Sequence, residues 1–187
     1  PKGDNFVGTE TFHWVDSSRH EWFTTENADD LREIMVQSWY PSTDNQFKEV
    51  EPYMDFIELR SKTIAAAGNL PSFLPSHLNL VKTNSYSNIP CKVQQGGLPV
   101  VIFSHGITGS RHLHQAFFEH LSSHGYIVIA LDHSYDSNLT IFPDGRIADY
   151  RSEITGHPDS INIRKSQIDT RTKDIVFILN QLTKVHQ

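Results

Sequence analysis

The sequence predicts an α/β fold built on a parallel sheet, and one block of the chain carries most of that prediction. Residues 99–103 and 126–132 are apolar on both faces, which is typical of strands buried in a parallel sheet. Residues 111–124 lie between them, with apolar side chains at helical spacing and Gly125 placed to end the helix. Strand, helix and strand in this order predict a βαβ unit.

The N-terminal part predicts two further strands. Residues 9–15 alternate, with Phe12 and Trp14 on one face, so we expect a half-exposed strand there. Residues 16–19 are expected to turn the chain. Residues 33–40 are rich in β-branched and aromatic side chains and predict a second strand, stopped by Pro41.

The middle of the chain is more irregular. Residues 53–82 predict a mixed helical region, broken at Gly68, and we interpret it as a helical insertion within one domain spanning 1–187. Residues 84–97 and 134–157 are expected to be loops, the second with a turn signal at Pro143-Asp144-Gly145.

A last helix is predicted from Asp159 or Ser160 onwards. Its apolar face is expected to hold Ile168, Ile175, Ile178, Leu179 and Leu182. In an α/β fold such a face is buried against a sheet, and another parallel strand should follow. The sequence ends at Gln187 without one. We therefore expect the N-terminal half of a mostly parallel sheet, with the helix packing on strands that this chain does not supply.

Composition narrows the function classes. The 187 residues include 16 Lys and Arg against 22 Asp and Glu, and the resulting net charge of −6 argues against a nucleic-acid partner. We find no apolar stretch of about 18 residues that would cross a membrane. The chain starts at Pro1 without a visible signal peptide, so we expect a trimmed start. Localisation is undecided, with secretion favoured over the cytoplasm.

The segment from Val100 to Gly109 carries the chemistry. An apolar strand runs directly into a His-Gly turn, and a turn at the carboxyl end of a parallel strand can aim backbone N–H groups at a ligand. The sequence contains no G-x-S-x-G, so the nucleophile elbow that accompanies such a turn in serine hydrolases is absent from these residues.

At several motifs the chain resembles the α/β-hydrolase superfamily, and within it the platelet-activating factor acetylhydrolase-like esterases. These motifs are Val15-Asp16-Ser17-Ser18-Arg19 with Glu21, Val36-Gln37-Ser38-Trp39-Tyr40-Pro41, Phe103-Ser104-His105-Gly106 followed by Thr108-Gly109-Ser110-Arg111, Ser123-His124-Gly125-Tyr126-Ile127-Val128, and Phe142-Pro143-Asp144-Gly145. The set covers nearly the whole chain in the family's order.

The resemblance implies the α/β-hydrolase fold and hydrolysis of carboxylic esters by a Ser-His-Asp triad. It implies that the backbone N–H of Ile107 is an oxyanion donor, supported by His105, Gly106, Thr108 and Gly109. The nucleophile, acid and base are expected C-terminal to this chain, on a segment of the same gene product. No cofactor and no metal are expected. The expected substrate is a small or phospholipid-like ester.

Several single residues allow more than one interpretation. His105 could act as a general base, but a structural role in the turn is favoured because the resemblance puts the base later. Ser104 lacks elbow glycines and is not favoured as a nucleophile. Asp132 ends a strand, and a structural or pocket-rim role is preferred to catalysis. His120 and His124 share a helix face, yet no third metal ligand is evident, so a solvated face is expected.

Two alternatives concern the protein as a whole. The chain could belong to a non-catalytic binding or scaffold protein of the same fold that lacks a nucleophile. A Cys nucleophile of the dienelactone-hydrolase type is less well supported, because Cys91 is the only cysteine and lies in a predicted loop. The apolar residues of 53–82 fit packing against the core better than a weak contact with a membrane surface, which remains an alternative.

Overall fold

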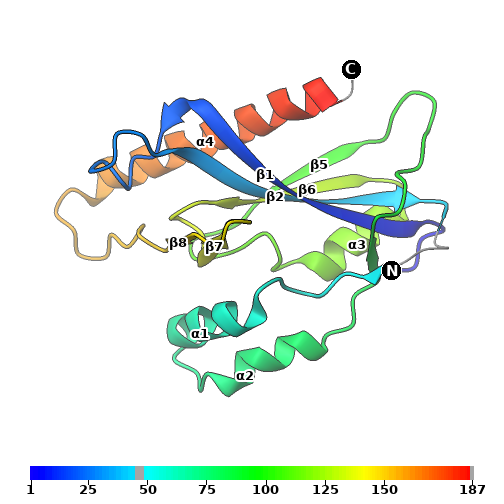
Figure 1. Cartoon of the computed structure of the whole chain (residues 1–187), viewed down its shortest axis with the longest axis horizontal. Coiled ribbons are helices and arrows are strands. Elements are labelled where there is room, and N and C mark those ends of the chain that lie inside the picture. The colour runs from blue at the N-terminus through cyan, green and yellow to red at the C-terminus, as the bar shows by residue number, and fades with distance from the viewer. Residues whose placement is uncertain (45–48, 186–187) are drawn as a thin grey trace.

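The computed structural model describes residues 1–44 and 49–185, and its centre is a six-stranded sheet in the order β3-β4-β1-β2-β6-β5 (Figure 1). Its strands are β1 (Phe6–His20), β2 (Leu31–Ser42), β3 (Glu49–Val50), β4 (Ser85–Ser87), β5 (Val100–Ser104) and β6 (Ile127–His133). A separate hairpin is formed by β7 (Leu139–Ile141) and β8 (Ile147–Asp149).

The predicted βαβ unit is confirmed. β5 and β6 are neighbours and run parallel, with Val101 opposite Val128 and Phe103 opposite Ala130. Helix α3 (Gln115–Ser123) connects them. β2 pairs antiparallel with both β6 and β1, so the two predicted N-terminal strands extend the sheet on the far side of β6. The carboxyl ends of β5 and β6 therefore meet at one edge of the sheet.

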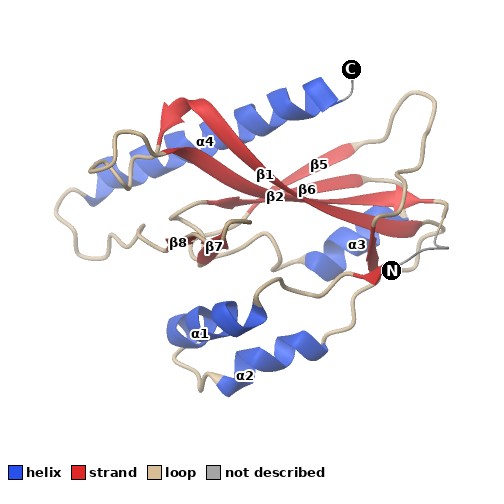
Figure 2. Ribbon diagram, in the orientation of Figure 1, coloured by secondary structure: helices blue, strands red, loops and turns tan. Residues whose placement is uncertain are grey.

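Helices cover both faces of this sheet, as Figure 2 shows for α3 and for α4 (Ser160–Val185). Because successive residues of a strand point to opposite faces, each face has its own core. The core on the α3 side contains Val7, Trp39, Phe118, Val128 and Ala130. The core on the α4 side contains Ile34, Val36, Ile129, Leu131 and Ile178.

The region 53–82 is helical as predicted. It contains α1 (Ile57–Gly68), α2 (Phe73–Ser76) and a 3₁₀ helix, η1 (His77–Leu80), and α1 ends at Gly68, where the break was expected. Figure 1 shows α1 and α2 on the same side of the sheet as α3. Its interpretation as an insertion stays a prediction. In the part of the chain that the structure describes, no helix has both the length and the apolar composition needed to cross a membrane.

Two strand boundaries predicted from the sequence are wrong. Residues 16–19 do not turn the chain, because β1 continues to His20 through an irregularity in register after Asp16. The Asp16 carboxylate accepts hydrogen bonds from the Ser18 amide and hydroxyl and pairs with Arg19. The Ser18 amide therefore has a partner although it lies outside the regular ladder. Pro41 does not stop β2, which continues to Ser42.

The two predicted loops contain short strands. Residues 84–97 include β4, which pairs with β1, and residues 134–157 include the β7–β8 hairpin. The turn signal in that second loop is confirmed, because Gly145 adopts a φ of 87° and its amide donates to the Phe142 carbonyl at 3.0 Å. Helix α3 begins at Gln115, later than the predicted residue 111.

The predicted apolar face of α4 is only partly correct. Ile178 is fully buried, and Phe177 and Leu182 pack beside it. All three lie against β2 and β6 of this same chain, so the expectation that the helix packs on strands from elsewhere is wrong. Ile168 and Leu179 are 55% and 47% exposed. The buried face includes the polar residues Gln167 and Asp174. The face deduced from apolar residues alone is therefore rotated about the helix axis relative to the face that is buried.

Candidate active site

The candidate site lies where β5 ends and the chain turns towards α3. Ser104 is the last residue of β5, and Gly106, Ile107 and Thr108 follow in an exposed turn. The amide of Gly109 donates to the Gly106 carbonyl at 3.0 Å and closes this turn. Thr108 has a φ of 56°, a left-handed conformation that is uncommon for a β-branched residue and is seen most often at tight, functional turns.

The two glycines of the turn differ in what they contribute to it. Neither Gly106 nor Gly109 adopts a positive φ, so their conformational range is not what forms the turn. Gly109 is required for space instead. A Cβ atom there would lie 2.8 Å from Cβ of His105 and 3.0 Å from the Gly106 carbonyl oxygen, whereas a Cβ on Gly106 would meet nothing within 4 Å.

The amide of Ile107 is the group that the resemblance singled out. The residue is 55% exposed, and within residues 1–44 and 49–185 its N–H has no hydrogen-bond acceptor. An amide without an internal acceptor, in an exposed residue at the carboxyl end of a parallel strand, is available as an oxyanion donor.

His105 holds the turn from inside. Its side chain is buried, its Nδ1 lies 2.6 Å from the Gly106 carbonyl oxygen, and its Nε2 accepts the backbone N–H of His133 at 3.2 Å. The His105 carbonyl accepts a hydrogen bond from Arg171 of α4 at 2.6 Å. Burial lowers the pKa of His105, which favours the neutral ring. These contacts agree with the structural interpretation of this residue.

Sequence reasoning missed a second feature beside the turn. The Ser104 hydroxyl lies 2.8 Å from Nε2 of His133, and Nδ1 of His133 lies 2.8 Å from a carboxylate oxygen of Asp174 on α4. Serine, histidine and aspartate are thus connected in the order of a hydrolase triad. No sequence signal could have found this, because the hydrogen-bonded residues are 29 and 41 positions apart.

Two arginines compensate the charge of Asp174. Arg32 contacts both carboxylate oxygens, at 3.1 and 2.6 Å, and Arg19 approaches at 2.9 Å. Arg32 also pairs with Glu21 at 2.6 Å. Burial alone would raise the pKa of Asp174, but Arg32 and the hydrogen bond to His133 lower it overall. Burial lowers the pKa of His133 to about 4, against the opposing effect of Asp174.

A second buried ion-pair network anchors the end of the turn. Both carboxylate oxygens of Asp132 bind Arg111, one to its amide and one to its guanidinium, and Arg111 also pairs with Asp55. Asp55 in turn pairs with Arg60 of α1 at 2.6 Å. Asp132 is completely buried in these contacts, as the structural interpretation expected. The network ties the helical region 53–82 to the sheet.

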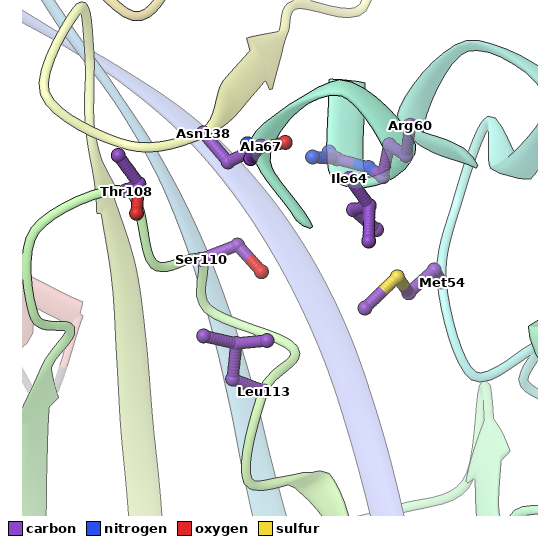
Figure 3. A pocket seen from close by; sticks show the side chains of 8 residues that line it. All are labelled: Met54, Arg60, Ile64, Ala67, Thr108, Ser110, Leu113 and Asn138. Atoms are coloured by element: carbon purple, nitrogen blue, oxygen red, sulfur yellow. The ribbon is translucent and has the colours of Figure 1, made fainter. Parts of the chain in front are cut away.

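A cavity of about 120 Å³ lies between this helical region and the turn (Figure 3). Its lining residues are Met54, Arg60, Ile64, Ala67, Thr108, Ser110, Leu113 and Asn138. Thr108 belongs to the turn and Ser110 follows it, so the cavity adjoins the turn that contains Ile107. Most of its wall is apolar.

The histidines considered as metal ligands do not form a cluster of that kind. His120 and His124 stack on the exposed side of α3, and Nδ1 of His124 lies 2.8 Å from the carbonyl oxygen of His120. Among the described residues there is no group of three or more His, Cys, Asp or Glu side chains that could hold a metal ion.

The sheet order, the two helical layers and the turn after β5 together define the α/β-hydrolase fold. A solved ferulic acid esterase from Streptomyces cinnamoneus superposes on 96% of this chain and 47% of its own length, with a TM-score of 0.74 and 30% sequence identity. The family model described as platelet-activating factor acetylhydrolase, isoform II, matches residues 22–187. The chain belongs to this family.

Curated relatives agree with this assignment. A platelet-activating factor acetylhydrolase from Cavia porcellus is 33% identical over 104 residues, which cover 54% of this chain and 24% of that protein. A probable 1-alkyl-2-acetylglycerophosphocholine esterase from Arthroderma benhamiae is 32% identical over 88 residues, covering 47% of this chain and 22% of that protein. In these two alignments the chain spans about a quarter of the length of its relatives.

Proposed function

We propose that the protein to which this chain belongs is a serine-type carboxylic ester hydrolase, and that this chain supplies one of its two oxyanion donors. The observation that carries the proposal is the Ile107 amide, exposed and without an acceptor among the described residues at the carboxyl end of β5. Membership of the acetylhydrolase family and the likeness to a solved esterase support it.

In this mechanism a serine attacks the ester carbonyl and the carbonyl oxygen becomes an oxyanion. The Ile107 N–H donates to that oxygen, and the amide after the nucleophile supplies the second donor. A donor of this kind acts mainly in the transition state, and its loss costs about 2.7–4 kcal/mol in other hydrolases. His105, Gly106, Thr108 and Gly109 hold the turn in shape.

The nucleophile, acid and base are proposed to lie on a C-terminal segment of the same gene product. The absence of G-x-S-x-G from this chain supports this. So does the position of β5, which in the described sheet pairs with β6 alone and is the edge strand. A strand added beside β5 would bring its carboxyl end next to Ile107. Exposed apolar residues of α4, Ile168, Val176 and Leu179, would then have partners.

The proposed substrate is a small or phospholipid-like ester. The names of the relatives, an acetylhydrolase and an alkyl-acetylglycerophosphocholine esterase, support that class. The apolar cavity beside the turn supports it as well, because one side of an ester bound at Ile107 would enter it. A volume of about 120 Å³ favours a short group over a long chain.

A weak contact with a membrane surface is kept as part of this proposal. Apolar side chains are exposed along the helical region, among them Phe56, Phe73 and Leu80 at 52%, 61% and 71%. Packing against the core, the alternative explanation of the same residues, does not account for these three. Sedimentation of the full-length protein with neutral phospholipid vesicles tests the contact, and recovery of all protein in the supernatant would contradict it.

Hydrolysis of p-nitrophenyl acetate tests the proposal as a whole. We expect no activity above background from residues 1–187 alone, and activity from the full-length protein or from this chain combined with its C-terminal complement. An inactive full-length protein, tested with several short-chain and phospholipid esters, would favour the non-catalytic scaffold instead. Activity of residues 1–187 alone would contradict the proposed division of the site.

A further inference from the structure

The orientation of the Ile107 amide can be traced to one histidine tautomer. The His133 backbone N–H can only donate, so Nε2 of His105 must be the accepting, unprotonated nitrogen. The proton of the neutral ring is then on Nδ1, and it is donated to the Gly106 carbonyl oxygen 2.6 Å away. That oxygen receives a second hydrogen bond from the Gly109 amide at 3.0 Å.

Two hydrogen bonds thus hold the Gly106 carbonyl towards the interior of the turn. The Gly106–Ile107 peptide bond is planar and trans, so its C=O and N–H point in opposite directions. Holding the carbonyl inward therefore points the Ile107 N–H outward. If the peptide rotated by half a turn, the N–H would face the His105 ring and the carbonyl oxygen would occupy the place of the oxyanion.

We infer that His105 is a positioning residue whose Nδ1–H sets the direction of the oxyanion amide, and that the Ser104–His133–Asp174 chain, in which His133 and Asp174 are buried and Ser104 is exposed, is the anchor for this histidine and has no hydrolytic role. The inference rests on the proposed function and deepens it. Asp174 bonds the side chain of His133, and that side chain bonds the Ser104 hydroxyl. The backbone N–H of His133 bonds the ring of His105, the residue that follows Ser104. The rings of His105 and His133 meet edge to face, with centroids 5.2 Å apart.

The burial of His133 argues against a hydrolytic triad, although Ser104 itself is exposed. A general base must take a proton from the nucleophile and then reach the leaving group, and His133 is completely buried. The carboxylate of Asp174 is shared with Arg32 and Arg19, so it stabilises an imidazolium less than an uncompensated carboxylate would. A third arginine, Arg171, lies near both histidines and holds the His105 carbonyl.

Two variants of His105 in the full-length protein separate positioning from packing. In His105→Asn the amide nitrogen takes the place of Nδ1 and can still donate to Gly106, whereas in His105→Gln the terminal group takes the place of Nε2 and leaves Gly106 without that donor. Gln is closer to His in volume. A packing role therefore predicts that Gln replaces His better than Asn does, and a positioning role predicts the reverse.

We expect kcat for p-nitrophenyl acetate to fall by about 10²–10³ in His105→Gln, with KM nearly unchanged, because an oxyanion donor acts in the transition state. We expect the kcat of His105→Asn to be at least about a tenth of the wild-type kcat. A kcat that is higher in His105→Gln than in His105→Asn would overturn the inference. So would the same kcat and the same KM in both variants.

Two readouts do not depend on activity. The ¹⁵N chemical shifts of His105 in the wild-type protein should identify the Nδ1–H tautomer, and crystal structures should show the Gly106–Ile107 peptide rotated in His105→Gln but retained in His105→Asn. An Nε2–H tautomer, or an unrotated peptide in both variants, would refute the positioning role even if the enzyme is active. A wild-type protein without esterase activity but with these structural results would refute only the proposed function.

Discussion

The Ser104 hydroxyl donates to Nε2 of His133 across 2.8 Å, at the point where two parallel strands end side by side. With Asp174 behind the histidine, this pair reproduces the atom order of a serine hydrolase triad in a chain that has no nucleophile elbow. Hydrogen-bond order alone therefore does not identify the catalytic residues. Exposure and basicity of the histidine decide, and His133 has neither.

Ser104→Ala in the full-length protein tests this distinction. Removal of a true nucleophile lowers kcat by about 10⁶ in a comparable hydrolase. Removal of the Ser104 hydroxyl leaves the ring contacts of His105 in place, because these run to Gly106 and to the His133 backbone, and Asp174 still holds His133. We expect kcat for p-nitrophenyl acetate to fall by less than about tenfold. Activity reduced to background in a folded variant would make Ser104 the nucleophile.

The buried pair of Arg111 and Asp132 should be important for stability. Arg111→Met removes the guanidinium partner of the buried Asp132 carboxylate, while Asp55 keeps its pair with Arg60, and breaking a buried pair in this way costs about 3–5 kcal/mol. Arg151→Ala is the control, because Arg151 and its partner Asp149 are both exposed and surface pairs contribute about 0–1 kcal/mol. Urea unfolding measures both. Equal destabilisation in the two variants would contradict the assignment.

Gly109 and Gly106 should respond differently to the same substitution. In Gly109→Ala the new methyl group overlaps His105 and the Gly106 carbonyl, and relief of such overlap typically costs about 1–3 kcal/mol. It should also displace His105 and lower kcat. Gly106→Ala meets no neighbouring atom in this chain and should change the free energy of unfolding less. The idea fails if Gly106→Ala is the more destabilised of the two.

The buried histidines should make the fold sensitive to acid. The pKa of His133 is about 4 in the folded state against 6.5 for a free side chain, and that of His105 is also lowered. Between these values the unfolded chain binds more protons than the folded one, so stability falls as the pH drops from 6.5 towards 4. Carboxylates with lowered pKa, such as Asp174, add their own loss at lower pH, as the pH falls through 3.8.

Urea unfolding of the full-length protein at several pH values checks this. In His133→Gln the decline in stability between pH 6.5 and pH 4 should be shallower than in the wild type, because one neutral buried ring has been removed. His120→Gln, on the exposed side of α3, should leave the slope as it is. Identical slopes in wild type and His133→Gln would show that His133 is not responsible.

The parts of the fold that could be predicted from the sequence are those with a strong local pattern. The strands β5 and β6 are apolar on both faces, and Gly125 and Gly145 mark the ends of α3 and of the β7–β8 turn. The short strands β4, β7 and β8 have three residues each, too few for a pattern to be detected. They exist because tertiary contacts stabilise them.

The buried face of α4 and the network around Asp174 could not be predicted for a related reason. Buried polar residues are stable only with partners, and one partner of Asp174, Arg32, is 142 positions away in the sequence. A pattern of apolar residues cannot include such a position in a core. The turn around Ile107 could be predicted, because its motif is contiguous, whereas the His105 tautomer depends on the distant His133.

The central claim is that this chain carries the oxyanion turn and that the nucleophile lies beyond it. The most direct measurement is labelling of the full-length protein with a serine-reactive phosphonate, followed by proteolysis and mass spectrometry of the modified peptide. We predict a single labelled serine C-terminal to Gln187, within a G-x-S-x-G, with Ser104 unmodified. A phosphonate adduct on Ser104 would contradict the account and make the Ser104–His133–Asp174 chain the catalytic triad.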